Sequence, residues 1–120
     1  MFLQVVGDEC VSTNEDIIKA EEKQTLNGVT LTLAKSKTVS GFIGLWQKAE
    51  SLGVPLVAVD ENEVDDPFLI HLAVALRVSQ VRLGGLVGGF ANKYNELLRL
   101  EDGSNGEDDG VGYIGAAWRK

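Results

Sequence analysis

The sequence predicts an α/β fold built from four consecutive parallel strand and helix units. Four short apolar runs alternate with four longer segments whose apolar residues recur with a helical period. The connections between them are short, which favours parallel neighbouring strands joined by crossover helices.

The first unit begins with an apolar strand over residues 3–6 that ends at Gly7 and Asp8. A helix follows, with Thr13 or Asn14 as its N-cap and with acidic residues in its first turn. The inner face of this helix is predicted to carry Ile17, Ile18 and Ala20.

The second unit has a strand over residues 29–33 in which apolar residues alternate with Thr30 and Thr32. One face of this strand is therefore apolar and the other is small and polar. Thr38 is predicted to cap a second helix, which keeps its apolar period until Gly53.

The third strand is predicted over residues 54–59, and Asp65, Asp66 and Pro67 form a strong helix start after it. The fourth strand covers residues 80–83, and a last helix covers about residues 89–100. His71 falls within the third helix, where we expect a structural or surface role.

The chain divides into residues 1–101, which hold the four units, an acidic and glycine-rich linker over residues 102–110, and a tail over residues 111–120. The tail contains Tyr113, Ile114 and Trp118 and is apolar enough to dock. It either folds back on its own helices or anchors the chain to a protein partner.

Charge and composition exclude several classes of function. The 120 residues carry a formal net charge of −7, which argues against nucleic acid or an anionic membrane surface as a partner. No apolar run approaches the roughly 20 residues of a membrane span. The single cysteine, Cys10, leaves no internal disulfide, and we expect a soluble, cytoplasmic protein.

Two stretches resemble the C-terminal half of the enolase barrel. The first is residues 3–9 (LQVVGDE), followed by a helix start at residues 12–14; the second runs from residues 76–82 (LRVSQVR) to residues 91–100 (ANKYNELLRL). They occur in the order and at nearly the spacing of that family, so the resemblance covers roughly residues 3–101. It implies half of an enolase-type (β/α)8 barrel, with the threonine face of the second strand turned inward.

Enolases interconvert 2-phosphoglycerate and phosphoenolpyruvate, which requires a base with a tuned pKa and divalent cations. The resemblance aligns Asp8 with a metal-binding aspartate of the family at the rim where barrel sites are built. One carboxylate does not hold Mg²⁺ tightly, so we expect Asp8 to be solvated or to cap a helix and to be only a vestigial metal ligand.

The family's catalytic lysine aligns with Thr32, whose hydroxyl lacks a suitable pKa for that base. Lys35 and Lys37 follow in what is predicted to be a loop, and their taking over the role would require the strand end to be rebuilt. We therefore predict no catalytic residue at this position.

The family's His-Arg-Ser loop, which grips the substrate phosphate, aligns with Asp60, Glu61 and Asn62. Two carboxylates there would repel a phosphorylated acid. The family's second lysine aligns with Arg82, which we expect to pair with Asp60 or Glu61 across the rim.

These changes favour a non-catalytic, enolase-like scaffolding subunit without a cofactor. A half-barrel leaves two open sheet edges and an uncovered inner face, so we expect a protein partner: a second copy, a complementary chain, or a large assembly. Divergent enolase-like proteins of cilia and flagella suggest such an assembly by analogy.

Two alternatives stay open. The chain is either a subunit or fragment of an active phosphopyruvate hydratase or related lyase, which would use Mg²⁺, or part of a longer chain whose upstream segment supplies the rest of the barrel.

Overall fold

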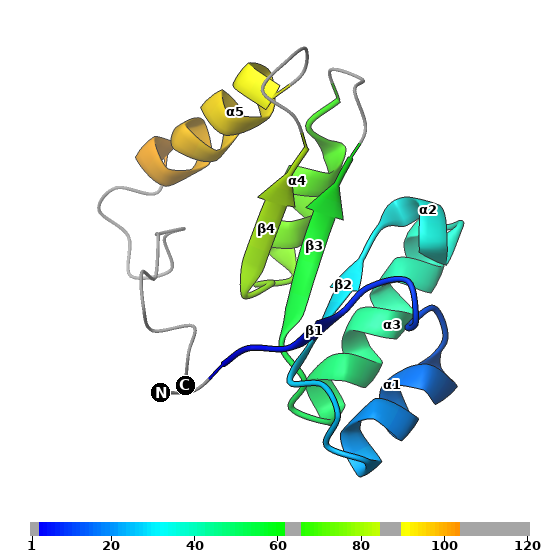
Figure 1. Cartoon of the computed structure of the whole chain (residues 1–120). Coiled ribbons are helices and arrows are strands. Elements are labelled where there is room, and N and C mark those ends of the chain that lie inside the picture. Colours follow the sequence, from blue (N-terminus) through cyan, green and yellow to red (C-terminus); the bar gives the residue numbers. More distant parts are fainter. Residues whose placement is uncertain (1–2, 62–65, 85–89, 104–120) are drawn as a thin grey trace.

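The computed structural model describes residues 3–61, 66–84 and 90–103, and these residues form four strands and five helices (Figure 1). The elements in chain order are β1 (Val6–Gly7), α1 (Asn14–Glu22), β2 (Gly28–Leu31), α2 (Leu33–Ser36), α3 (Val39–Ser51), β3 (Leu56–Asp60), α4 (Phe68–Ala75), β4 (Gln80–Leu83) and α5 (Phe90–Gly103).

The four strands form one parallel sheet in the order β1, β2, β3, β4. Val29 of β2 lies opposite Leu56 of β3, and Val59 of β3 lies opposite Arg82 of β4. Within the described residues β1 and β4 are thus the two edge strands. The prediction of four consecutive parallel strand and helix units is confirmed.

The boundaries differ from the predicted ones at several places, among them β3, which covers Leu56–Asp60 instead of residues 54–59. β1 is only two residues long, and α2 is a short helix where the sequence predicted a strand end and a loop. α5 continues to Gly103, two residues into the segment assigned to the linker. Asn62, the rest of the linker and the tail with Tyr113, Ile114 and Trp118 lie outside the described residues.

Two helices start at the threonines that the sequence indicated. Thr13 caps α1: its hydroxyl accepts a hydrogen bond from the Asp16 amide, and the Asp16 carboxylate accepts one from the Thr13 amide at 3.0 Å. The Thr38 hydroxyl caps α3 by accepting from the Gly41 amide. α3 then ends before Gly53, whose φ of 67° favours glycine.

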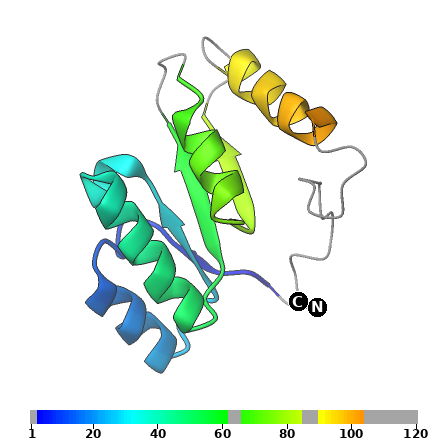
Figure 2. The same cartoon turned by 180° about the vertical axis from the view of Figure 1, so that it is seen from behind.

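Helices α1, α3 and α4 cover one face of the sheet, as the view from behind shows (Figure 2). The core lies between these helices and the sheet. Its fully buried members include Ile17 of α1, Phe42 of α3 and Ile70 of α4, each at most 2% exposed. The alternation in β2 places Val29 and Leu31 in the same core.

The opposite face, which we call the inner face, is less open than expected. Thr30, Val57 and Val59 on this face are 6%, 8% and 2% exposed. The side chain of Gln80 in β4 donates a hydrogen bond to Gln4, so the segment before β1 reaches across from β2 to β4 (Figure 1). Among the described residues, the inner-face side chains of β2 and β3 are therefore less exposed than an uncovered inner face implies.

The helix α5 lies beyond β4 and packs against α4 (Figures 1 and 2). His71 of α4 and Glu96 of α5 join the two helices at 3.0 Å, which gives His71 the structural role expected for it. No helix in the described ranges is long and apolar enough to cross a membrane.

The capping box predicts a specific loss of stability in acid. Hydrogen bonds from Ser12 and Thr13 hold the pKa of the Asp16 carboxyl below its ordinary value of 3.8. The contribution of Asp16 is therefore complete above that value and disappears as the pH falls through the lower pKa of the folded state. We expect Asp16→Ala to lose less stability than the wild type between pH 5 and pH 2, as measured by urea unfolding. Glu15→Ala, in the same helical turn, should lose as much as the wild type; equal losses in all three proteins would contradict the prediction.

Candidate functional site

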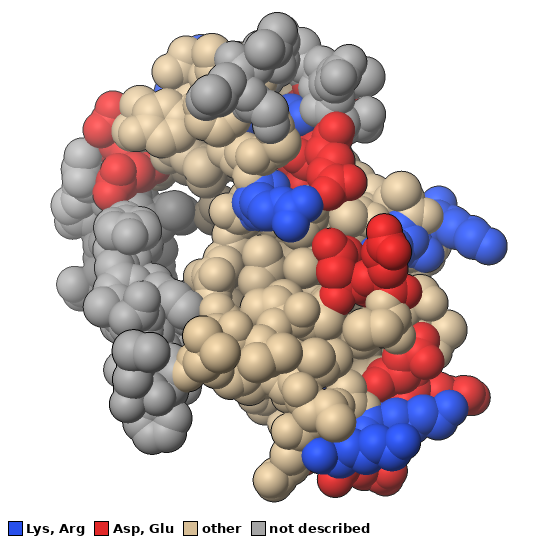
Figure 3. All heavy atoms as spheres, viewed as in Figure 1, with Lys and Arg blue, Asp and Glu red and all other residues tan. Residues whose placement is uncertain are grey.

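The carboxyl ends of the four strands meet at one rim of the sheet, which brings the residues singled out in the sequence together. Asp8 follows β1, Thr32 follows β2, Asp60 ends β3 and Arg82 lies in β4. Figure 3 shows acidic and basic side chains side by side above and beside an uncharged central area. Since all strands are parallel, this charged rim is the candidate site.

Asp8 is held by two neighbours at the rim. The Thr30 hydroxyl donates to Asp8 Oδ1 at 2.7 Å, and the Lys35 ammonium donates to the same oxygen at 2.7 Å. These hydrogen bonds from Lys35 and Thr30 lower the pKa of the Asp8 carboxyl, and the charge of Arg82 adds to the effect. Asp8 is thus an ion-paired carboxylate whose side chain is 48% exposed. This exposure agrees with the solvated role expected for it; the alternative role as a helix cap is not observed at α1, which Thr13 caps.

Lys35 reaches the rim because the end of β2 is rebuilt as α2. The Thr32 hydroxyl accepts a hydrogen bond from the Lys35 amide at 3.1 Å and so starts this helix. Lys37 then ends it in the left-handed conformation, with its amide bonded to the Leu33 carbonyl. The placement of Lys35 in a loop was therefore wrong: a threonine that follows a strand also caps a helix, and this turn carries the lysine to Asp8.

Arg82 and Glu61 form the second pair at the rim. Arg82 Nη2 lies 2.6 Å from Glu61 Oε1, and the two side chains are 55% and 62% exposed. This pair confirms one of the two partners expected for Arg82. Because both groups are well solvated, the pair contributes at most about 1 kcal/mol to stability.

Asp60 has a different partner, which the sequence analysis missed. Lys93 Nζ of α5 lies 3.0 Å from Asp60 Oδ1, and the two side chains are only 1% and 6% exposed. A signal for this pair was present, because Lys93 falls on the same helical stripe as Phe90, Leu97 and Leu100. A lysine on an apolar stripe requires a buried acid as its partner.

The close approach of β3 and β4 at the rim depends on Gly84. Its amide donates to the Asp60 carbonyl at 2.7 Å, and a Cβ atom there would lie 2.9 Å from that same oxygen. Only glycine fits at this distance.

The described side chains do not fit a magnesium ion. Mg²⁺ takes about six oxygen ligands and gives up its water reluctantly, so it requires accessible carboxylate oxygens. No three acidic, histidine or cysteine side chains come together in a metal-binding group within residues 3–61, 66–84 and 90–103. Asp8 Oδ1 is already bonded to the Lys35 ammonium.

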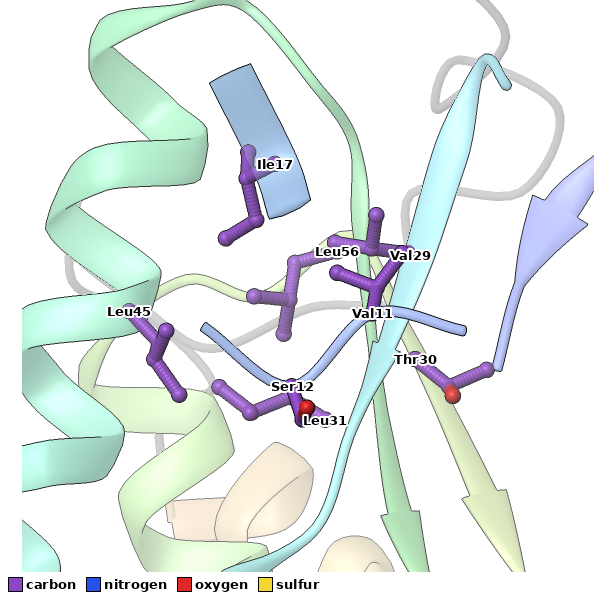
Figure 4. Close-up of a pocket in the computed structure, with 8 residues that line it drawn as sticks. All are labelled: Val11, Ser12, Ile17, Val29, Thr30, Leu31, Leu45 and Leu56. Atoms are coloured by element: carbon purple, nitrogen blue, oxygen red, sulfur yellow. The ribbon is translucent and has the colours of Figure 1, made fainter. Parts of the chain in front are cut away.

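A small cavity lies between β2 and the helices (Figure 4). Its volume is about 10 Å³, and its lining is mostly apolar, with Ile17, Leu31 and Leu45 among the contributing residues. Thr30 points to the other side of β2 from Ile17 and Leu45. The cavity holds at most one water molecule and is too small for a substrate.

The order of parallel strands, the helices on the outer face and the polar rim at the carboxyl ends together define part of a (β/α) barrel domain. The chain matches the family described as the enolase C-terminal TIM barrel domain over residues 1–120. It therefore belongs to that family.

Two curated relatives carry the name enolase. The chain is 29% identical over 120 residues to "Enolase 1" of Desulfitobacterium hafniense, which covers 96% of this chain and 28% of that protein. It is 34% identical over 100 residues to "Enolase" of Picrophilus torridus, which covers 82% of this chain and 25% of that protein. The chain thus spans about a quarter of the length of these relatives.

The buried pair predicts a large effect for a single substitution in α5. Lys93→Met should lower the free energy of unfolding by clearly more than the control below, because it removes the ammonium that lies 3.0 Å from the buried Asp60 carboxylate. Arg99→Met, on the same helix, removes a cation that is 67% exposed and should cost no more than about 1 kcal/mol. Urea unfolding of the three proteins measures both effects; equal costs for the two variants would show that the buried pair does not hold α5.

Proposed function

We propose that the chain is a non-catalytic, enolase-like subunit that docks into a larger protein assembly. The observation that carries the proposal is the Lys35 ammonium, which neutralises Asp8 at the rim. The reaction of this family would require that carboxylate to bind a metal cation. A carboxylate that is already bonded to an internal ammonium serves the fold instead.

The rest of the rim supports the same proposal. Thr32 uses its hydroxyl to cap α2, and Arg82 is paired with Glu61 at 2.6 Å. The Asp60 carboxylate is buried against Lys93. Each charged residue aligned with the family's active site is therefore engaged by a neighbour of opposite charge, which favours a structural role.

The two sheet edges support docking to a protein partner. β1 and β4 have no further strand beside them among the described residues. Leu3 and Val5, just before β1, are 73% and 45% exposed, so apolar surface lies beside this edge. A second copy, a complementary chain or a large assembly would cover it, and a ciliary or flagellar assembly stays a prediction by analogy.

The second candidate function is a subunit or fragment of an active enolase. Two observations favour it: the relatives are named enolases, and Lys35 brings an amine to the same rim as Asp8. Against it stands Thr32, whose hydroxyl does not ionise in the range that a base requires. In this case Mg²⁺ would need ligands beyond the described residues.

One experiment separates the two functions. The native mass of the chain is measured alone and after recovery from its cells, and each species is assayed for dehydration of 2-phosphoglycerate with Mg²⁺. We expect a large stoichiometric complex and no turnover.

Turnover that is lost in Asp8→Ala but kept in Glu9→Ala, its exposed neighbour, would overturn the proposal. A complex without turnover in all three proteins supports it.

A further inference from the structure

We propose that the tail over residues 111–120 docks into a cavity between the C-terminal ends of α3 and α4, and so folds back on its own chain. This cavity, which we call the amino-end cavity, has a volume of about 250 Å³ and lies at the amino ends of β3 and β4, opposite the charged rim. Docking there does not depend on the proposed function, because no rim residue lines the cavity.

The walls of the amino-end cavity are largely apolar. They come from Trp46 of α3, from Val54 before β3 and from Val78 before β4. These three side chains pack against the core but are only partly buried, so each still presents apolar surface to the cavity. Covering such surface with another apolar segment is favourable in water.

Two opposite charges line the same cavity, one from each helix end. Glu50 lies in the last turn of α3, and Arg77 follows α4 by two residues. Both residues are exposed, and neither forms an ion pair with another residue that the structure describes. They are therefore available to a segment that brings the opposite charges.

The backbone at position 77 indicates that the arginine side chain contributes to an interaction. Both helices end with an amide that donates to the carbonyl five residues earlier, Val54 to Ala49 at 2.9 Å and Val78 to Ala73 at 3.0 Å. The residue before that amide is left-handed in both cases, Gly53 with a φ of 67° and Arg77 with a φ of 53°. Glycine adopts this conformation without strain, whereas arginine does not. The turn alone favours glycine at both places, so we expect the guanidinium to offset the strain.

The end of the sequence carries the pattern that complements the cavity. Residues 107–109 are acidic, residues 110–118 are uncharged and include two aromatic side chains, and residues 119–120 are basic. These residues lie outside the described ranges. Their order of acid, apolar segment and base matches Arg77, the apolar walls and Glu50 in turn.

The chain reaches the cavity from the side that this order requires. α4 lies between α5 and α3 in both views (Figures 1 and 2), and α5 packs against α4. A segment that continues from α5 therefore meets Arg77 beside α4 before it meets Glu50 on α3. Residues 104–120 span up to about 56 Å when extended, which exceeds the largest dimension of the structure, 40 Å.

The test uses the two tryptophans of the chain, because Trp46 lines the cavity and Trp118 lies in the tail. Trp118→Phe and Trp118→Ser both leave Trp46 as the single tryptophan, but only the first keeps an aromatic side chain in the tail. We expect quenching of Trp46 fluorescence by acrylamide to be at least about twofold stronger in Trp118→Ser, because a docked side chain buries most of its contact surface in such a site. The difference should not change with protein concentration in the micromolar range, because a tethered segment acts at a millimolar effective concentration.

A second substitution tests the charge at the cavity. Arg77→Gly suits the left-handed backbone, so it removes the guanidinium without breaking the turn. It should strengthen the quenching of Trp46 in Trp118→Phe but not in Trp118→Ser. Lys37→Gly is the matched control, because Lys37 is also a cation in the left-handed conformation at a helix end and does not line the cavity.

Three results would overturn the proposal. Equal quenching in Trp118→Phe and Trp118→Ser would mean that the tail does not cover Trp46. A difference that grows with protein concentration would mean that the tail of a second copy occupies the cavity. Equal effects of Arg77→Gly and Lys37→Gly in the Trp118→Phe protein would mean that Arg77 does not hold the tail.

Discussion

The buried ion pair of Asp60 and Lys93 is the constraint on which the arrangement of the fourth unit depends. Every residue of β3 is buried, and the strand ends in a carboxylate that is 5% exposed. An unpaired charge there would cost several kcal/mol, so a cation must reach it. Lys93 does so from α5, and the helix must therefore lie beyond β4, where Glu96 also contacts His71 of α4.

The three ion pairs at the rim contribute to the structure by different amounts, because their exposure differs. The pair of Arg82 and Glu61 is largely solvated and contributes little. The Lys35 side chain is mostly buried, while its partner carboxylate is half-exposed. The exposure of this pair is therefore intermediate between the exposed pair of Arg82 and Glu61 and the buried pair of Lys93 and Asp60. The charged side chains of the rim are thus paired with one another. A ligand-binding site, in contrast, leaves charged groups available for the ligand.

The sequence was sufficient where the determining interactions are local and insufficient where they are tertiary. Thr13 and Thr38 were identifiable as caps because each bonds to a backbone amide three residues ahead. The partner of Lys93 lies 33 positions earlier in the chain, so only the helical stripe indicated its burial. Lys35 was misplaced for another reason: the alternation of apolar and polar residues extends through Leu33, and nothing in the pattern shows that the strand stops two residues earlier, at Leu31.

Thr32 shows why family membership and activity are separate questions for this chain. The resemblance predicts that Thr32 stands where the family has its base. In this chain the Thr32 hydroxyl starts the turn that brings the Lys35 amine to the same rim, three residues later, where it contacts Asp8. Proton abstraction depends on where the base points, whereas charge balance depends only on distance. The charges at the rim of this domain are therefore balanced within the chain, and the Lys35 amine reaches Asp8 from α2.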